Sequence, residues 1–470
     1  MIKFQKYASI FSIILFCILG VFLIFSLLNI YNLFIDYSLN IMGYVLVIWI
    51  IYTWKSSTKE SIFTPYIIFM IFIVLFNYGQ PLLWAFNIIS DTDITNYLFL
   101  GTNLVASKID IQNLKILTCI MIYALHFGAI LSTSFKKTEK YSNVNYDRYI
   151  LLVGYIFAII SVPLTLYRYL TFLSISSVHG YGAIYYSNDF QLASLTFIVE
   201  MFFFPSLLCI LLGGKFKKKY QIIVWSIMLF YTIINLSMGD RGTWLYKIII
   251  LIWLEFYYYQ PKIDFKKIML YILLLLPFLY IVYAIVELRD YGKIEITSII
   301  KELGNIEFPL ISALREMGGS MNILAYIYIY GASFWNYGNT YIPAILGVIS
   351  SRYFPMLGLQ VILIDDYFSQ YLNLSYGTGF SLFGECYLNF GIFSVLFLLI
   401  LGYVLGLLFR NNSNHFSNIR LFIIASSLST LIGWIRGSSF LYFKSFFYGV
   451  IVFYLLIVLL SRIKINGRRL

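Results

Sequence analysis

Long, uninterrupted apolar runs restrict the fold of this chain more than any other feature. Several runs reach the ~20 residues that a helix needs to cross the ~30 Å hydrocarbon core of a membrane. Only helices and closed barrels satisfy their backbone hydrogen bonds in lipid, and runs without a period of two select helices. With 61% hydrophobic residues and a mean hydropathy of +0.84, the sequence predicts an all-α, polytopic transmembrane helix bundle.

The apolar runs predict about twelve spans. They lie at about 8–28, 38–54, 63–86, 114–134, 149–171, 195–214, 221–238, 243–260, 268–286, 390–409, 420–437 and 441–461. The first run is too long for a signal-peptide core and lacks a small-residue cleavage site, so we expect it to be retained. We expect three parts: spans one to nine in 1–286, an extracytoplasmic loop in 287–389, and spans ten to twelve with the C-terminus in 390–470.

Lysine and arginine are distributed unevenly between the two sides of the predicted bundle. With the N-terminus inside, about two-thirds of the 33 basic residues fall in cytoplasmic segments. The acidic residues in the same segments are Glu60, Glu139, Asp147 and Asp264. This bias predicts a plasma (inner) membrane protein with both termini in the cytoplasm, and a net charge of +12 that reflects topology and anionic lipid, not nucleic acid.

The 287–389 loop then faces outward, and it concentrates charge in a chain with only 11% charged residues. Its charged residues include Glu287, Arg289, Asp290, Glu302, Arg315, Glu316, Arg352, Asp365, Asp366 and Glu385. Apolar residues at helical spacing run from Ile296 to Leu303, and a second such run follows Pro309. We therefore predict a structured cap of amphipathic helices that leads into a re-entry motif.

The sequence gives no support for chemistry that depends on a nucleotide or a metal. It has no Walker loop and no dinucleotide fingerprint, and its four cysteines form no CxxC pair. Asp91 with Asp93, and Asp365 with Asp366, are outward carboxylate pairs that could hold a hard cation. Two loop carboxylates are more often solvated than ligating, so we predict no metal and no cofactor.

Three short motifs resemble the O-antigen polysaccharide polymerase (Wzy) family. They are Gly239-Asp-Arg241-Gly-Thr-Trp244, Arg315-Glu316-Met-Gly318-Gly-Ser320, and the 377–391 stretch that contains Glu385, Tyr387 and Asn389. The many-span layout with a large late outer loop is also similar to that family. The resemblance implies a C-type glycosyltransferase at the outer face of the membrane, which polymerises oligosaccharide repeat units into O-antigen or capsular polysaccharide.

The resemblance also implies the substrates. Polyprenyl-diphosphate-linked oligosaccharides would serve as donor and acceptor, and a growing glycan would pass to a sugar hydroxyl of a new lipid-linked repeat unit. Membrane lipid would surround the enzyme, and a chain-length regulator protein is a further expected partner. Such a reaction needs outward cations for the diphosphate, a carboxylate or imidazole near the acceptor hydroxyl, and a cavity open to lipid.

Arg241 is the first candidate for binding diphosphate, because it opens the eighth span at the helix N-terminus. Lys247 lies about two turns deeper in the same span at ~1.5 Å per residue. In the alternative interpretation, Asp240 caps the helix and pairs with Arg241, and Lys247 only pairs with Glu200.

Further cations lie at other outer positions. Arg436 ends the eleventh span, and Lys444 and Arg168 are lesser candidates; snorkelling to the interface is the alternative for all three. Arg315 and Glu316 are adjacent in the loop, where Arg315 could bind diphosphate or a sugar acid and Glu316 could act as a base. The alternative for this pair is a solvated helix face.

Glu385 is the first candidate for the base or for orienting the acceptor, with Glu316 second. Glu385 and Asn389 share one helix face at i, i+4 spacing, with Tyr387 close by. The alternative is a structural hydrogen bond between the cap and the span. His179 is the one histidine in a predicted outer loop, and it is a candidate for binding sugar.

Two other functions remain open at this point. A lipid-linked oligosaccharide flippase, a transporter, predicts charged residues along several spans and two related halves, whereas the polar residues here gather in one late loop. An O-antigen ligase would share the donor and the pocket, and the sequence alone does not separate it from a polymerase.

Overall fold

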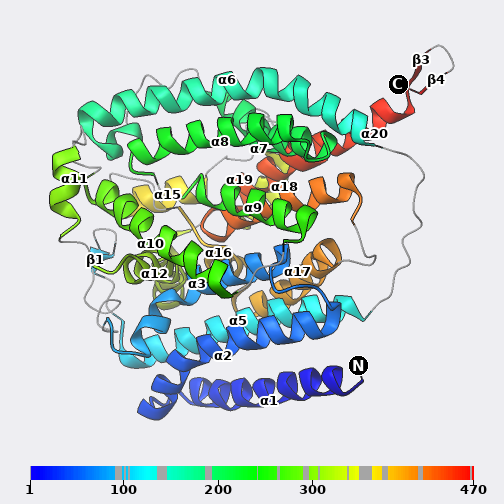
Figure 1. Cartoon of the computed structure of the whole chain (residues 1–470). Helices are drawn as coiled ribbons and strands as arrows, with labels where there is room; N and C mark the ends of the chain where they lie inside the picture. The colour runs from blue at the N-terminus through cyan, green and yellow to red at the C-terminus, as the bar shows by residue number, and fades with distance from the viewer. Residues whose placement is uncertain are drawn as a thin grey trace. The chain divides into compact units, whose positions relative to one another are not determined.

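The chain is almost entirely helical in a computed structural model. The structure describes residues 2–89, 98–99, 102–103, 106–134, 146–185, 193–240, 242–261, 265–288, 296–304, 307–335, 338–348, 363–372, 379–410, 416–465 and 468–469. Two-residue strands form two small antiparallel pairs, β1 (Leu98–Phe99) with β2 (Thr102–Asn103) and β3 (Lys464–Ile465) with β4 (Arg468–Arg469). The prediction of an all-α chain is confirmed (Figure 1).

Within the described residues, 11 helices are long and apolar enough to cross a membrane. They cover Tyr7–Leu27, Leu33–Thr58, Pro65–Trp84, Lys108–Thr133, Asp147–His179, Thr196–Gly213, Lys218–Ser237, Met269–Leu288, Leu382–Phe409, Asn418–Ile435 and Ser439–Arg462. The predicted polytopic bundle is therefore confirmed. The expected eighth span is the exception, because α9 (Leu245–Tyr259) has 15 residues and is about 22 Å long, short of a full crossing.

The first of two compact units comprises residues 1–140, 311–415 and 431–444. Its elements include α1 (Ile2–Leu27), α2 (Leu33–Thr58), α3 (Pro65–Trp84), α5 (Lys108–Thr133), α13 (Met321–Tyr330), η4 (Gly331–Phe334), α14 (Tyr341–Leu346), α15 (Ile364–Tyr371), α16 (Leu382–Phe390), η7 (Gly391–Phe393) and α17 (Ser394–Phe409). α1 packs against α2, and α2 packs against α3 and α5.

Small residues bring α5 and α17 into close contact inside this unit. A Cβ added at Gly402 would lie 1.8 Å from the Leu125 carbonyl oxygen, and one at Gly406 would lie 2.2 Å from the Ser132 hydroxyl. Without a strong hydrophobic force between helices in lipid, such close backbone packing holds spans together. These glycines thus fix α17, the span that follows the predicted re-entry motif.

Two predicted cap helices appear as three helices in the structure: α11 (Ile296–Glu302), α12 (Pro309–Gly318) and α13. The second predicted run breaks after Gly318, which packs against α3; a Cβ there would lie 2.4 Å from the Gln80 backbone nitrogen. The apolar face predicted for that run is only partly buried. Met321 and Leu324 are fully buried, whereas Leu310 is 47% exposed.

The second unit comprises residues 141–310, 416–430 and 445–470. Its helices are α6 (Asp147–His179), η1 (Tyr181–Tyr185), α7 (Ala193–Gly213), α8 (Lys218–Ser237), α9, α10 (Phe265–Leu288), α11, η8 (a π-helical stretch, Phe447–Val452) and α20 (Phe453–Arg462). α6 packs against α7, where a Cβ at Gly213 would lie 2.4 Å from the Leu151 backbone nitrogen. Residues of α18 (Asn418–Ile435) and α19 (Ser439–Phe446) are divided between the two units.

Candidate functional site

Separate segments of the first unit converge on residues 436–439, which comprise the short connection between α18 and α19 and the first residue of α19. These four residues are called the 436–439 turn below. The Arg436 carbonyl oxygen accepts a hydrogen bond from the Phe380 N–H at 3.1 Å. Gly379 approaches the same carbonyl so closely that a Cβ there would lie 2.6 Å from it. Gly379 also has φ +66°, which favours glycine. The re-entry segment therefore packs directly on the backbone that carries Arg436.

Glu385 also holds this turn through hydrogen bonds. Its side chain is fully buried, and its carboxylate accepts hydrogen bonds from the Ser439 N–H at 2.8 Å and the Ser439 hydroxyl at 2.6 Å. The Thr340 hydroxyl donates a third at 2.6 Å. Because Ser439 begins α19, the carboxylate caps a helix N-terminus, where negative charge is favourable.

Asn389 completes this buried network. It accepts a hydrogen bond from the Thr340 N–H at 2.8 Å and donates to the Thr340 hydroxyl at 2.8 Å. Glu385 and Asn389 thus face one partner, as their i, i+4 spacing predicts. Tyr387 lies elsewhere on α16, partly buried, with its ring centroid 6.0 Å from that of Tyr328. The network joins the starts of α14 and α19 to α16.

Asp365, in the first turn of α15, is a second carboxylate beside the turn. It interacts with Ser438, and its negative charge repels that of Glu385. Its Oδ1 atom is buried and has no hydrogen-bond partner among the described residues. Burial raises the pKa of Asp365 to about 6, and Ser438 opposes part of that rise. The described residues hold no group of three or more possible His, Cys, Asp or Glu metal ligands.

Two arginines of the candidate set belong to this unit and have exposed side chains, Arg436 on the turn and Arg315 on α12. Glu316 is partly exposed. The motif that contains Arg315 and the motif that contains Glu385 both contact the same part of α3. The Ser381 hydroxyl, which caps α16, donates to Asn77 Oδ1 at 3.3 Å, and Gly318 packs against Gly79 and Gln80. The structure thus ties the Arg315 motif and the Glu385 motif to a single stretch of helix.

Of the remaining candidates, Arg168, Lys247 and His179 lie in the second unit, Lys444 lies in the first, and others lie outside the described residues. Arg241 is outside them, as are Asp91 and Asp93. Lys247 is buried and donates to the Thr243 carbonyl at 2.7 Å and the Tyr231 hydroxyl at 3.3 Å. His179 is exposed but is the last residue of α6, so the expectation that it lies in a loop is wrong.

The ion pair suggested between Lys247 and Glu200 does not form. Glu200 instead pairs with Arg168 at 3.0 Å and accepts a hydrogen bond from Tyr169 at 2.6 Å. That geometry agrees with a structural role for Arg168. Lys444 lies on α19, 5.6 Å from the centroid of the Phe440 ring, as an interfacial cation does.

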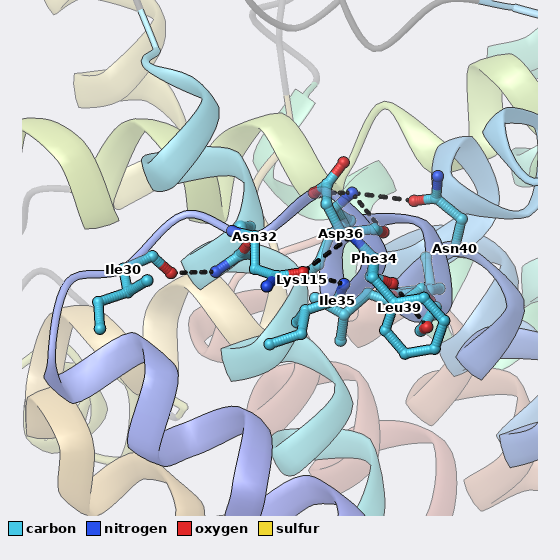
Figure 2. Close-up of polar contacts among 11 residues, drawn as sticks. Ile30, Asn32, Phe34, Ile35, Asp36, Leu39, Asn40 and Lys115 are labelled. Carbon is cyan, nitrogen blue, oxygen red and sulfur yellow. Dashed lines mark hydrogen bonds and ion pairs between the residues drawn. The ribbon is translucent and has the colours of Figure 1, made fainter.

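A buried cation that the sequence analysis did not single out is Lys115 on α5 (Figure 2). It is fully buried and pairs with the Asp36 carboxylate at 2.5 Å, and it also donates to Asn40 Oδ1 at 2.9 Å. One turn before it, Gln112 accepts from the Asn32 N–H at 2.9 Å and donates to the Ile30 carbonyl at 3.0 Å. The sequence did hold a signal for this pair. Lys115 lies within one apolar run, and Asp36 and Asn40 lie at i, i+4 spacing in another.

The comparisons with known proteins agree with the motifs. A family model described as O-antigen polysaccharide polymerase Wzy matches residues 8–466, nearly the whole chain. No curated protein and no solved structure matches it. Members of this family are integral inner-membrane proteins that polymerise O-antigen repeat units, so the flippase and ligase alternatives are not favoured. The chain belongs to the O-antigen polysaccharide polymerase Wzy family.

Proposed function

We propose that this polymerase takes its glycan from a polyprenyl diphosphate carrier and that the 436–439 turn binds the diphosphate. One observation carries this proposal: the exposed Arg436 lies on a turn that Phe380 and Glu385 hold directly by hydrogen bonds, while Thr340 holds Glu385. Guanidinium groups bind phosphate oxygens in bidentate fashion. A cation held in place before the substrate arrives stabilises developing charge without reorganisation.

The two carboxylates have different proposed roles. Glu385 is a positioning residue, because among the described residues the hydrogen bonds of its buried carboxylate go to Thr340 and Ser439. Asp365 lies beside the same turn, and its Oδ1 atom, which has no hydrogen-bond partner in the described part of the chain, receives the proton of the acceptor hydroxyl. The acceptor oxygen then attacks the anomeric carbon, the bond from that carbon to the diphosphate breaks, and the carrier leaves as its diphosphate.

Other candidates keep lesser roles in this proposal. Arg315 is a second diphosphate contact and Glu316 a second candidate base. Tyr387 and Asn389 are candidates for binding sugar, although the hydrogen bonds of Asn389 go to Thr340 and to its own helix. The roles of Arg241, Lys247 and His179 stay predictions.

The orientation follows from the uneven distribution of basic residues, which places both termini in the cytoplasm and the 287–389 part outside. The donor and acceptor are then lipid-linked repeat units that have already crossed the membrane. A chain-length regulator protein is a proposed partner. The product is O-antigen or, in a different envelope, capsular polysaccharide.

The proposal is tested in a strain that lacks the native gene and carries each variant at the wild-type protein level. Arg436→Ala should leave a single repeat unit on the final acceptor and no ladder of longer glycans, whereas Arg436→Lys should keep a short, weak ladder. Lys218→Ala, at the start of α8, serves as the control and should give the wild-type ladder. A wild-type ladder from Arg436→Ala at equal protein level would show that this arginine does not bind the donor.

Asp365→Asn and Glu385→Gln separate the two carboxylate roles. Asp365→Asn should abolish the ladder without lowering the thermal stability of the purified protein. Glu385→Gln should lower both together. If Asp365→Asn supports a normal ladder, the proton acceptor is another group.

A further inference from the structure

A cavity of about 870 Å³ lies within the first unit, among α1, α2, α5 and α17. This volume is in the range of ~300–1,000 Å³ that is typical of small-molecule sites in proteins. The cavity is separate from the residues of the 436–439 turn and from the Glu385 network, none of which line it. It is therefore a second candidate binding site.

The lining of the cavity is polar at one end and apolar along the rest. Hydroxyl groups gather where α1 begins and where α2 and α5 end: Ser9, Ser56, Ser57, Thr133 and Ser134. The Ser56 hydroxyl oxygen is buried and has no hydrogen-bond partner among the described residues. Farther along α1 the wall consists of Phe16, Leu19, Gly20 and Leu23. This gradient matches a ligand with a polar head and an apolar tail.

The dimensions match a lipid chain. From Ser9 to Leu23 the α1 wall is about 21 Å long at ~1.5 Å per residue, more than half of the ~30 Å hydrocarbon core. Ile13 and Phe16 on that wall have 62% and 63% of their surface uncovered by protein. If the cavity were empty, the atoms of its wall would lack van der Waals contacts. Water would replace them poorly, because an apolar wall offers water few hydrogen-bond partners. An apolar chain supplies the missing contacts.

We propose that this cavity holds an acyl chain of an anionic phospholipid, with the phosphate at its hydroxyl-rich end. Lys55 and Lys59, both exposed, lie next to that end in the sequence and supply the complementary charge. In the orientation proposed above this end faces the cytoplasmic leaflet. The occupant is then a lipid of the leaflet opposite to the one that presents the diphosphate donor.

The site is probed with phosphatidylglycerol that carries a diazirine on one acyl chain, in nanodiscs of phosphatidylcholine that contain the full-length protein. Crosslinked peptides should include the cavity wall on α1 and α5, around Phe16 and Phe127. In Gly20→Phe the new side chain would occupy part of the cavity, because Gly20 lines it and a Cβ there has no atom within 4 Å. That variant should lower crosslinking to these peptides at least fivefold.

Ile14→Phe is the matched control, since Ile14 lies on the same helix, is 51% exposed and does not line the cavity. It should crosslink like the wild type. If Gly20→Phe does not purify as a monodisperse protein, Ser57→Leu at the polar end makes the same test. Changing Lys55 and Lys59 to Gln should weaken the preference for phosphatidylglycerol over phosphatidylcholine by roughly fivefold per lysine, from ~1 kcal/mol per basic residue.

Two results would overturn the proposal. One is crosslinking, assigned to single residues, that is no stronger at Phe16 than at Ile14, or that Gly20→Phe leaves unchanged. The other is complete displacement of the probe by an equal mole fraction of undecaprenyl phosphate, which would assign the cavity to the carrier's polyprenyl tail. Neither result bears on the role of Arg436, which the ladder assay tests separately.

Discussion

Replacing Glu385 with alanine should open the 436–439 turn and expose a buried thiol nearby. The carboxylate accepts three hydrogen bonds, from the Thr340 hydroxyl and from the hydroxyl and N–H of Ser439. Alanine leaves these three donors buried without a partner. A buried unsatisfied group costs about 1–3 kcal/mol, so the loss is about 4 kcal/mol once some relaxation is allowed for.

The reporter for this prediction is Cys386, the residue next to Glu385. Its thiol is fully buried, 3.2 Å from the Tyr341 hydroxyl. Thiol labelling of a buried cysteine requires local opening. A loss of about 4 kcal/mol corresponds to an increase of up to about a thousandfold in the labelling rate of Cys386 relative to the rate in the wild type.

The increase in the labelling rate of Cys386 distinguishes loss of the whole Glu385 network from loss of one ordinary buried hydrogen bond. Glu385→Gln keeps part of the network, so its labelling rate should fall between those of the wild type and Glu385→Ala. Thr118→Ala is the control, because the buried Thr118 hydroxyl donates only to the Leu114 carbonyl of its own helix. If Glu385→Ala labels Cys386 no faster than Thr118→Ala does, Glu385 does not hold the turn and the positioning role is refuted.

Three further predictions test other parts of the structure. Lys115→Met leaves the Asp36 carboxylate without its buried partner and should cost about 3–5 kcal/mol; the pair Lys115→Met with Asp36→Leu should recover much of the loss in detergent unfolding curves. Because the pKa of Asp365 is raised from 3.8 to about 6, the ionised base is lost as pH falls through 6, so polymerisation by the wild type should fall below that pH, whereas Asp365→Asn should give no polymer at any pH. The same raised pKa makes the folded state less stable as pH rises from about 4 to about 6, and Asp365→Asn should remove this dependence of stability on pH. In Gly379→Ala the alanine would have to adopt a φ of +66°, and its Cβ would lie 2.6 Å from the Arg436 carbonyl oxygen. This substitution should therefore lower thermal stability and polymer length. Gly304→Ala is the control and should change neither, because the nearest atom to its Cβ would be 3.7 Å away.

The sequence predicts the helices of this protein well because membrane spans are governed by a local property. Twenty apolar residues form a helix in lipid whatever surrounds them, so the runs found in the sequence are also helices in the structure. The shortening of α9 and the break after Gly318 could not be predicted in this way. The break depends on α3, which is more than two hundred residues away in the sequence.

The candidate site was only partly predictable for the same reason. Glu385 and Asn389 could be placed on one face from their spacing, but their shared partner Thr340 is 45 and 49 residues away. Ser439 is 54 residues from Glu385. Only the folded chain shows that Glu385 is enclosed by these partners while Arg436 stays exposed on the same turn.

Arg436 is proposed to bind the diphosphate of the donor during polymerisation. The most direct test uses purified protein in detergent with a synthetic undecaprenyl-diphosphate-linked repeat unit and counts the repeats in each product by mass spectrometry. The wild type should give a series of products two or more repeats long with release of undecaprenyl diphosphate, and Arg436→Ala should leave only the single repeat. A product series from Arg436→Ala equal to that of the wild type would contradict the account.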